Sequence, residues 1–544
     1  MEKKKMAIYS IVALVALALL VVGATYAYFQ NQYGSASNAD VNVTTSTTDV
    51  LTFETGSNIS ITADQETFAQ GKGNQTGSTF ARATLQANNK TNTATANYYM
   101  YLNIENNTFT YTNTDKPELL LQVIDKTSGN PVTSITGLDY VTVTDGKNTS
   151  ISGFDITNKK GLITILNNKE ISASPKTIEE YTITITLVNH NFDQNNNTGK
   201  ILNGKLIIQK EKMITSISDV AKNGDNLVTA IENLSTKSKP SYTGLYHHDA
   251  SLTNGAGDNS YRFAGADPNN YVCFGSDEAT CPTENLYRII GVIDGKVKLI
   301  HAYGATTTML GTNEGYAKIY QEAWGDNLEL VQSFYKGKED FAKIGSYKWN
   351  KTRDNTWSTS TTNTINLNTN YLTYLDSKNT KWKTMIADTT WYVGGMTGDN
   401  GVLSNAKTAY NYEVGANKDA TTTVTSKIGL MYVSEYYYGA TPDYWTLPGY
   451  DPNGQPSEDQ KWWIGEDYSK ARNDNWLYTG LFEWTISRTS DPSDYAFAVG
   501  GYGLLGGNVV DPGGVAVRPS FCLSSSIKFT SGEGTAVNPI RIKL

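Results

Sequence analysis

Residues from about 40 to 211 alternate between apolar and polar side chains, and this period of two predicts β-strands. Residues 181–187 alternate cleanly between polar and apolar side chains. In the segment 98–104, Tyr98, Met100, Leu102 and Ile104 are predicted to face the core, and Tyr99, Tyr101 and Asn103 are predicted to face solvent. Turn signals separate the predicted strands at residues 128–131, at Asp145-Gly146 and at Asn203-Gly204. Short strands divided in this way predict an antiparallel β-sandwich over residues 28–211.

The pattern changes from Tyr242 onward, where longer apolar runs predict an α+β domain over residues 241–544. Residues 286–292 are predicted to form a buried strand. Asp294-Gly295 is a hairpin turn signal, so residues 296–300 are predicted to be the second strand of a hairpin. Further strands are predicted at 483–488, 496–499 and 517–523, and helices at 317–324, 370–386 and 429–438.

Residues 212–240 carry apolar side chains at roughly helical spacing, from Ile217 to Leu234, and predict a helical connector that ends at Pro240. All 10 tryptophans lie between Trp324 and Trp484, and residues 28–320 contain none. So large a shift in composition indicates two domains with different cores. The predicted fold class is mainly β with some α.

The first thirty residues combine a basic start, Lys3 to Lys5, with an uncharged apolar block that continues to Phe29. A positive end, an apolar run and small residues before a cut are the parts of a secretory signal, so residues 1–27 are a predicted signal peptide cleaved between Ala27 and Tyr28. The alternative is a retained anchor over residues 6–29, which is long enough to span a bilayer. Both interpretations place the remaining chain outside the cytoplasm, extracellular or on the cell surface.

Residues 23–29, Gly-Ala-Thr-Tyr-Ala-Tyr-Phe, resemble the signal end of Gram-positive proteins processed by the SipW-type signal peptidase. That group includes the TasA and camelysin family of biofilm-matrix proteins. The resemblance covers the first thirty residues only. It implies secretion, and the β-sandwich expected next is compatible with that family in length and pattern.

Composition narrows the classes of partner. A chain of 544 residues exceeds a single core, which implies two or three domains. The net charge is −8, and removal of residues 1–27 with their three Lys and one Glu leaves −10. This charge argues against nucleic acid as a partner, and membrane contact is expected only through the N-terminal segment. The polar, weakly charged surface suits a carbohydrate-rich setting, although a solvated surface with no partner fits equally well.

Three cysteines are present, and an extracellular location permits a disulfide. Cys273 and Cys281 are eight residues apart beside Pro282, which favours a short stapled loop between them over the two pairings with Cys522. Cys522 lies in a predicted strand, where a buried thiol is common.

Residues 286–292, 484–488 and 517–519 together resemble an uncharacterised domain of Gram-positive surface proteins. That domain in turn resembles the formylglycine-generating-enzyme-like branch of the C-type lectin fold. The resemblance covers most of residues 260–540 and implies a C-type-lectin-like binding domain. The catalytic cysteine pair of that branch is not matched, because the late region contains only Cys522. The calcium-binding tripeptides of animal lectins are absent as well, so calcium-dependent sugar binding does not transfer.

No metal or cofactor is predicted. His247-His248-Asp249 fits a surface turn better than a metal site, because adjacent residues on an extended segment point to opposite faces. Residues 398–401 and 451–456 lack the spacing of a calcium loop and fit plain turns. The glycines at 500–507 lack the Lys of a phosphate loop and fit hairpin turns.

Aromatic residues give the best functional indication, because flat rings beside polar groups suit sugar or peptide ligands. Ordinary core packing is the alternative for each ring, and a structural role is the alternative for the arginine. The ligand-binding candidates are Trp462, Trp463, Trp476, Trp484, Tyr437 and Arg488.

Three functions remain open. The first is a non-enzymatic adhesion or matrix protein that binds a polysaccharide or a cell-surface protein. The second is an extracellular glycan hydrolase with a carboxylate pair such as Glu435 and Glu483. The third is a biofilm-matrix fibre subunit that self-associates by strand exchange.

Overall fold

The computed structural model describes residues 49–544, except 70, 89–92, 114–115, 191, 326–327, 338–340, 397–404, 416–421, 447–471, 491–492, 502 and 504. The chain divides into two compact units, residues 1–213 and 214–544. Strands account for 39% of the residues and helices for 20%, and the sheets are antiparallel. The prediction of a mainly β chain with some α is therefore confirmed.

The predicted cleavage site at Ala27 and Tyr28, and the predicted anchor over residues 6–29, lie outside the described residues. Within the described part of the chain, no helix combines the length and the apolar character that a membrane crossing requires.

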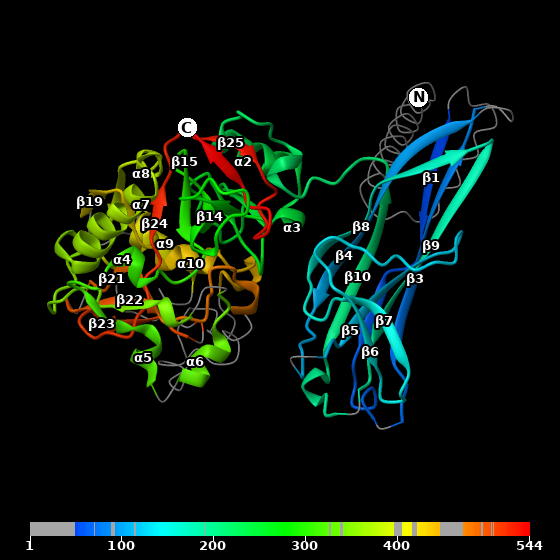
Figure 1. Ribbon diagram of the computed structural model, residues 1–544, viewed down its shortest axis with the longest axis horizontal. Coiled ribbons are helices and arrows are strands. Elements are labelled where there is room, and N and C mark those ends of the chain that lie inside the picture. Colours follow the sequence, from blue (N-terminus) through cyan, green and yellow to red (C-terminus); the bar gives the residue numbers. More distant parts are fainter. Residues whose placement is uncertain are drawn as a thin grey trace, which may run out of the picture. The chain divides into compact units, whose positions relative to one another are not determined.

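Unit 1 consists of two antiparallel sheets that share one core (Figure 1). The six-stranded sheet has the order β1 (Val50–Thr55), β3 (Gln75–Gln86), β9 (Lys176–Leu187), β5 (Leu119–Asp125), β7 (Ser150–Asp155), β6 (Tyr140–Thr144). The four-stranded sheet has the order β2 (Ile59–Thr62), β10 (Ile201–Gln209), β4 (Ala94–Asn107), β8 (Gly161–Ala173).

The predicted alternation is present in β4 and β9, whose apolar positions face the shared core. Tyr101 is an exception, because it lies on the face predicted to be wet and is nevertheless buried. Its hydroxyl accepts a hydrogen bond of 2.9 Å from the Met213 backbone N–H, so the chain that leaves β10 covers it.

The turn predicted at Asn203-Gly204 is wrong, because both residues lie inside β10, where the pairing with β4 contains a bulge. A Cβ on Gly204 would lie 3.2 Å from Leu102 Cδ1. The glycine therefore permits close approach within the sheet instead of reversing the chain.

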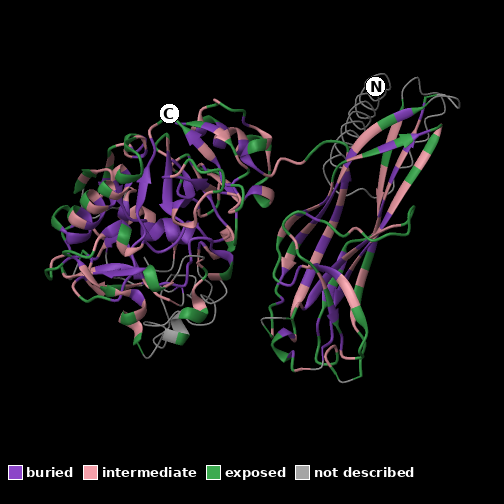
Figure 2. Cartoon of the chain, in the orientation of Figure 1, coloured by how far each residue is buried: buried purple, intermediate pink, exposed green. Residues whose placement is uncertain are grey.

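Unit 2 is organised around a seven-stranded sheet, whose strands β14 and β15 are buried along most of their length (Figures 1 and 2). Its order is β11 (Leu245–His248), β12 (Ser260–Phe263), β14 (Leu286–Ile293), β15 (Lys296–His301), β24 (Ser520–Cys522), β20 (Ile428–Gly429), with β13 (Tyr271–Cys273) also paired to β14. The predicted β14–β15 hairpin is confirmed. Its turn residues Asp294 and Gly295 have φ of 48° and 67°, as a two-residue turn with two left-handed positions requires.

Smaller sheets complete unit 2. A three-stranded sheet contains β21 (Glu483–Arg488), β22 (Tyr495–Val499) and β23 (Leu505–Val509), which confirms strands at 483–488 and 496–499. Strands β22 and β23 form a hairpin, but Gly506 and Gly507 pair with β22 inside β23, so the turn predicted at these two glycines is wrong. The two-stranded pairs are β16 (Tyr316–Ile319) with β17 (Gly345–Tyr347), β18 (Thr389–Tyr392) with β19 (Thr423–Ser426), and β25 (Lys528–Ser531) with β26 (Arg541–Lys543).

Three predicted helices differ from the observed ones. The segment 317–324 begins as strand β16 and turns helical only in α5 (Tyr320–Trp324). The segment 370–386 is divided among the end of a π-helix (Thr362–Tyr371), α7 (Leu372–Lys378) and α8 (Thr380–Thr384), because Asn379 is extended and its side chain caps α8. The segment 429–438 becomes helical only in α10 (Val433–Tyr438). Other α-helices of unit 2 are α3 (Pro240–Thr243), α4 (Thr307–Leu310), α6 (Leu328–Phe334) and α9 (Ala406–Glu413).

Residues 214–240, predicted as a connector, belong to unit 2. Helix α2 (Leu227–Lys237) is capped by the Asn226 side chain, and its apolar face is buried in the main core of unit 2. That core also contains seven of the tryptophans, namely Trp349, Trp357, Trp382, Trp391, Trp445, Trp476 and Trp484.

Candidate functional site

The structure places three of the predicted ligand-binding aromatics inside unit 2. Trp476, Trp484 and Tyr437 are 4%, 1% and 3% exposed. The indole N–H groups of Trp476 and Trp484 donate to the backbone oxygens of Phe263 and Tyr347, at 2.7 and 2.9 Å. Rings held in this way fill the core and offer no free face to a ligand. Trp462 and Trp463 lie outside the described residues.

Arg488 is part-buried and acts as a brace between β21 and the chain that follows β18. Its Nε donates to the Val393 oxygen at 2.9 Å and its Nη2 to the Gly394 oxygen at 2.8 Å. A further bond of 3.2 Å joins Nη1 to Asn355 Oδ1. These contacts support a structural role for Arg488, because its guanidinium N–H groups already donate to backbone oxygens.

Cys273 and Cys281 form the predicted disulfide. Cys522 is a free, buried thiol in β24, as predicted for a cysteine in a strand. Burial raises the pKa of the Cys522 thiol, which disfavours the reactive thiolate.

The surface turn predicted at His247-His248-Asp249 is wrong for His248, which is fully buried at the end of β11. His247 is half-exposed, stacks on Tyr261 and lies 3.5 Å from Asp249. Burial and the nearby Arg262 lower the pKa of His248 to about 3, so this imidazole is neutral at physiological pH. Its Nδ1 accepts a bond of 3.1 Å from the Ala256 N–H, so its Nε2 carries the proton.

A row of directly paired residues crosses the seven-stranded sheet, and it contains two buried cations, Arg262 and Lys298. The paired positions are Tyr246, Arg262, Gly291, Lys298 and Cys522, one from each of β11, β12, β14, β15 and β24. Directly opposed residues in an antiparallel sheet point to the same face. Gly291 separates the two cations, and a Cβ there would lie 2.1 Å from the Tyr261 oxygen.

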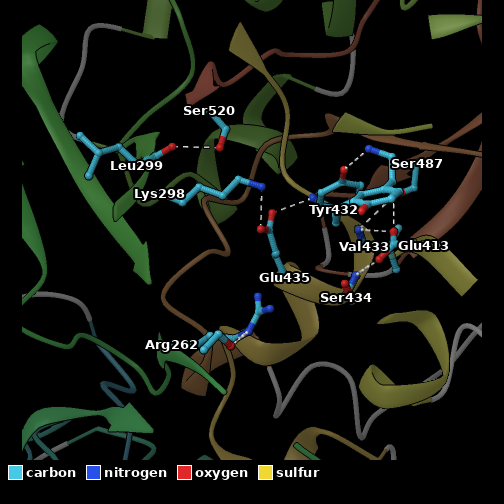
Figure 3. Close-up of polar contacts among 12 residues, drawn as sticks. Arg262, Lys298, Leu299, Glu413, Tyr432, Val433, Ser434, Glu435, Ser487 and Ser520 are labelled. Carbon is cyan, nitrogen blue, oxygen red and sulfur yellow. Dashed lines mark hydrogen bonds and ion pairs between the residues drawn. The ribbon is translucent and has the colours of Figure 1, made fainter. Parts of the chain in front are cut away.

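Lys298 is neutralised by Glu435, which projects from α10 (Figure 3). The Lys298 Nζ lies 2.6 Å from Glu435 Oε1, and the two side chains are 4% and 3% exposed. The ammonium also lies 4.7 Å from the ring centres of Trp391 and Tyr432. Glu435 Oε2 accepts the Tyr432 N–H at 2.9 Å, so the same carboxylate caps the helix that it attaches to the sheet.

Arg262, the second cation of the row, pairs with Asp258 at 2.7 Å. Its Nε donates to Ser260 Oγ at 2.8 Å. Although burial opposes it, the Arg262 guanidinium lowers the pKa of Asp258 to about 2. This pair is therefore ionised throughout the physiological range.

Glu413, the last residue of α9, is buried and is held by neutral donors (Figure 3). It accepts the Val433 and Ser434 N–H groups at 2.8 and 3.0 Å, and the Ser487 hydroxyl bonds to the same carboxylate. Burial raises the pKa of Glu413 to about 7, against an ordinary 4.5, although these hydrogen bonds oppose the shift. The side chain joins α9, α10 and β21.

The two carboxylates considered for glycan hydrolysis are each occupied by a separate cation. Glu435 pairs with Lys298, and Glu483 Oε1 lies 2.9 Å from Arg518 Nη2, with side-chain exposures of 1% for Glu483 and 2% for Arg518. A general acid and its partner must both reach the substrate. Two buried, separately neutralised carboxylates do not meet that requirement.

Sequence reasoning did not identify Lys298, Arg262 or Glu413. Lys298 had a usable signal, because it interrupts the apolar run Val297, Leu299, Ile300 in a strand predicted to be buried. A charge at such a position indicates a buried partner. Glu413 does not interrupt an apolar run, so the sequence gives no signal that it is buried. It contacts α10 only because of the tertiary fold.

Among the described residues, no three His, Cys, Asp or Glu side chains are grouped so that they could hold a metal ion. The loops 398–401 and 451–456 lie wholly outside those residues. No protein-family model matches the chain, and no curated protein matches it either.

Proposed function

We propose that the protein is a secreted or cell-surface bacterial protein with a non-catalytic binding role in adhesion or in an extracellular matrix. In this proposal unit 1 is a β-sandwich of the TasA type, and unit 2 is a C-type-lectin-like domain that binds a polysaccharide or a surface protein. The N-terminal segment exports the chain and is either removed or kept as its anchor.

The disulfide between Cys273 and Cys281 is the observation that carries this proposal. Disulfides persist in oxidising surroundings outside the cytoplasm and are rare within it. The basic-then-apolar N-terminus supports the same compartment independently.

Binding is favoured over hydrolysis because of the state of three buried carboxylates of unit 2, two of which formed the pair considered for catalysis. Glu435 and Glu483 are both neutralised and buried, and Glu413 is enclosed by the N–H groups of α10. These groups stabilise the fold and are not available to a glycosidic bond.

A panel of immobilised polysaccharides and peptidoglycan tests the proposal with the full-length protein. We expect retention on at least one member and no soluble sugar released during incubation. Released sugar fragments that increase with time would establish the hydrolase instead. Absence of retention on every glycan and on intact cells would remove the binding role.

A further inference from the structure

Three cations of unit 2 lie against aromatic rings on neighbouring segments, and this set is called the cation–aromatic face. Its cations are Arg288, Lys336 and Arg472, its part-exposed rings are Tyr271 and Phe334, and the rings of Trp476 and Tyr478 that also contact these cations are buried.

Arg288 is fixed between two rings. Its guanidinium carbon lies 4.1 Å from the ring centre of Tyr271 and 4.7 Å from that of Trp476. Its Nε donates to Asn270 Oδ1 at 2.7 Å, and its Nη2 lies 3.0 Å from Asp267. A planar cation held in this way keeps its orientation without a ligand.

Lys336 and Arg472 each lie against one aromatic ring. The Lys336 Nζ lies 4.7 Å from the ring centre of Tyr478 and donates to the Arg472 backbone oxygen at 3.3 Å. The Arg472 guanidinium carbon lies 5.0 Å from the ring centre of Phe334. Lys336 is exposed, and Arg472 and Phe334 are part-exposed, so solvent reaches this part of the face.

Backbone contacts hold the contributing segments side by side. Gly265, near the start of the loop that leads to Tyr271, bridges to Asn475, and the Lys336 N–H donates to the Thr479 oxygen at 2.9 Å. Among the residues that the structure describes, the acids nearby include Asp267, whose side chain is 74% exposed, and Asp474, which is buried. Arg288 is buried and paired with Asp267, so the cations of the face that solvent reaches are Lys336 and Arg472, on a chain whose net charge is −8.

We infer that the cation–aromatic face binds the carboxylate groups of an acidic polysaccharide. The inference rests on the proposed binding role and names the ligand class for it. Guanidinium and ammonium groups make charge-assisted hydrogen bonds to carboxylates, and the part-exposed rings of Tyr271 and Phe334 suit the apolar faces of sugar rings. A protein that is acidic overall would repel such a polymer elsewhere, so recognition is confined to this face.

The test measures binding of the full-length protein to sodium polygalacturonate, with neutral dextran of matched length and sodium polyphosphate as comparison polymers. The test variant is the pair Lys336→Gln and Arg472→Gln. The matched control is the pair Lys336→Arg and Arg472→Lys, which retains both charges. Tryptophan fluorescence confirms that each variant is folded.

We expect the protein to prefer polygalacturonate to both comparison polymers and to lose affinity as salt is raised. The double Gln variant should bind polygalacturonate about tenfold more weakly or worse, and the charge-retaining control within about threefold of wild type. Unchanged binding by a folded double Gln variant overturns the inference. Equal binding of polyphosphate overturns the assignment to a polysaccharide.

The comparison polymers also separate this inference from the proposed function. Retention on dextran or another neutral glycan, without binding of polygalacturonate, overturns the inference and leaves the binding role in place. Binding to none of these polymers overturns the inference, and the binding role falls only if retention on peptidoglycan and on intact cells is also absent.

Discussion

The two units bury different kinds of side chain. The shared core of unit 1 is largely aliphatic and is lined by the alternate positions of its strands. Unit 2 contains every buried cation among the described residues, namely Arg262, Arg288, Lys298 and Arg518. A core of the first kind depends on total volume and pattern. A core of the second kind depends on individual pairs, so single charge changes should distinguish the two units.

Removing a buried cation should have the largest effect. Lys298→Met leaves Glu435 buried without its partner, and we expect unit 2 to lose about 3–5 kcal/mol of unfolding free energy. Urea unfolding followed by tryptophan fluorescence measures this directly, because all 10 tryptophans lie in unit 2.

The matched control is Lys351→Met. Its ion pair with Glu314 is exposed, at 54% and 58%, so we expect a change within about 0.5 kcal/mol. Equal losses in the two variants contradict a structural role for Lys298.

Glu413 should make the stability of unit 2 depend on pH. Its pKa is raised from 4.5 in the unfolded chain to about 7 in the folded protein. The protonated side chain therefore stabilises unit 2 fully below pH 4.5, and this stabilisation is lost as pH rises through 7. Relative to Glu413→Gln, the wild type should lose about 3 kcal/mol between those values.

Unfolding curves collected from pH 4.5 to 8 measure the difference between wild type and Glu413→Gln. Comparing the two proteins removes the opposite contribution of His248, whose lowered pKa makes stability fall as pH drops below 6.5. A difference that does not vary with pH contradicts the assignment.

The disulfide should contribute less than either charged group. Replacing both Cys273 and Cys281 by Ala should lower the stability of unit 2 by about 2–3 kcal/mol, because a short closed loop restricts the unfolded chain. Reductant should destabilise the wild type and leave the double variant unchanged. A wild type that is insensitive to reductant would show that the bond contributes nothing.

The smallest expected effect concerns the β14–β15 turn. Gly295→Ala places a side chain at φ 67° and should cost about 1 kcal/mol, although no atom obstructs the new Cβ. Gly506 is also unobstructed but does not have a positive φ, so Gly506→Ala is the control and should be close to neutral. Equal effects contradict a conformational origin.

The sequence predicted features that depend on local patterns. Alternation identified β9, and Asp294-Gly295 identified the hairpin, because each depends on neighbours within a few residues. Asn203-Gly204 was misread as a turn, because the same dipeptide forms a bulge when a partner strand is present. The helical segment predicted at 370–386 is interrupted at Asn379, because apolar spacing does not indicate where the backbone becomes extended.

The candidate site was less predictable than the fold, for a physical reason. Trp476 and Trp484 read equally well as ligand contacts or as core, and only the packing of distant segments decides between them. The Lys298–Glu435 contact joins residues 137 positions apart, which no local pattern reports.

Protease digestion of intact expressing cells tests most directly the proposal that both units lie outside the cytoplasm. An antibody to unit 2 should lose its signal on whole cells, or detect the protein in the medium, while a cytoplasmic marker stays intact. Protection of unit 2 until the cells are lysed, with the Cys273 and Cys281 thiols open to alkylation, would contradict the account.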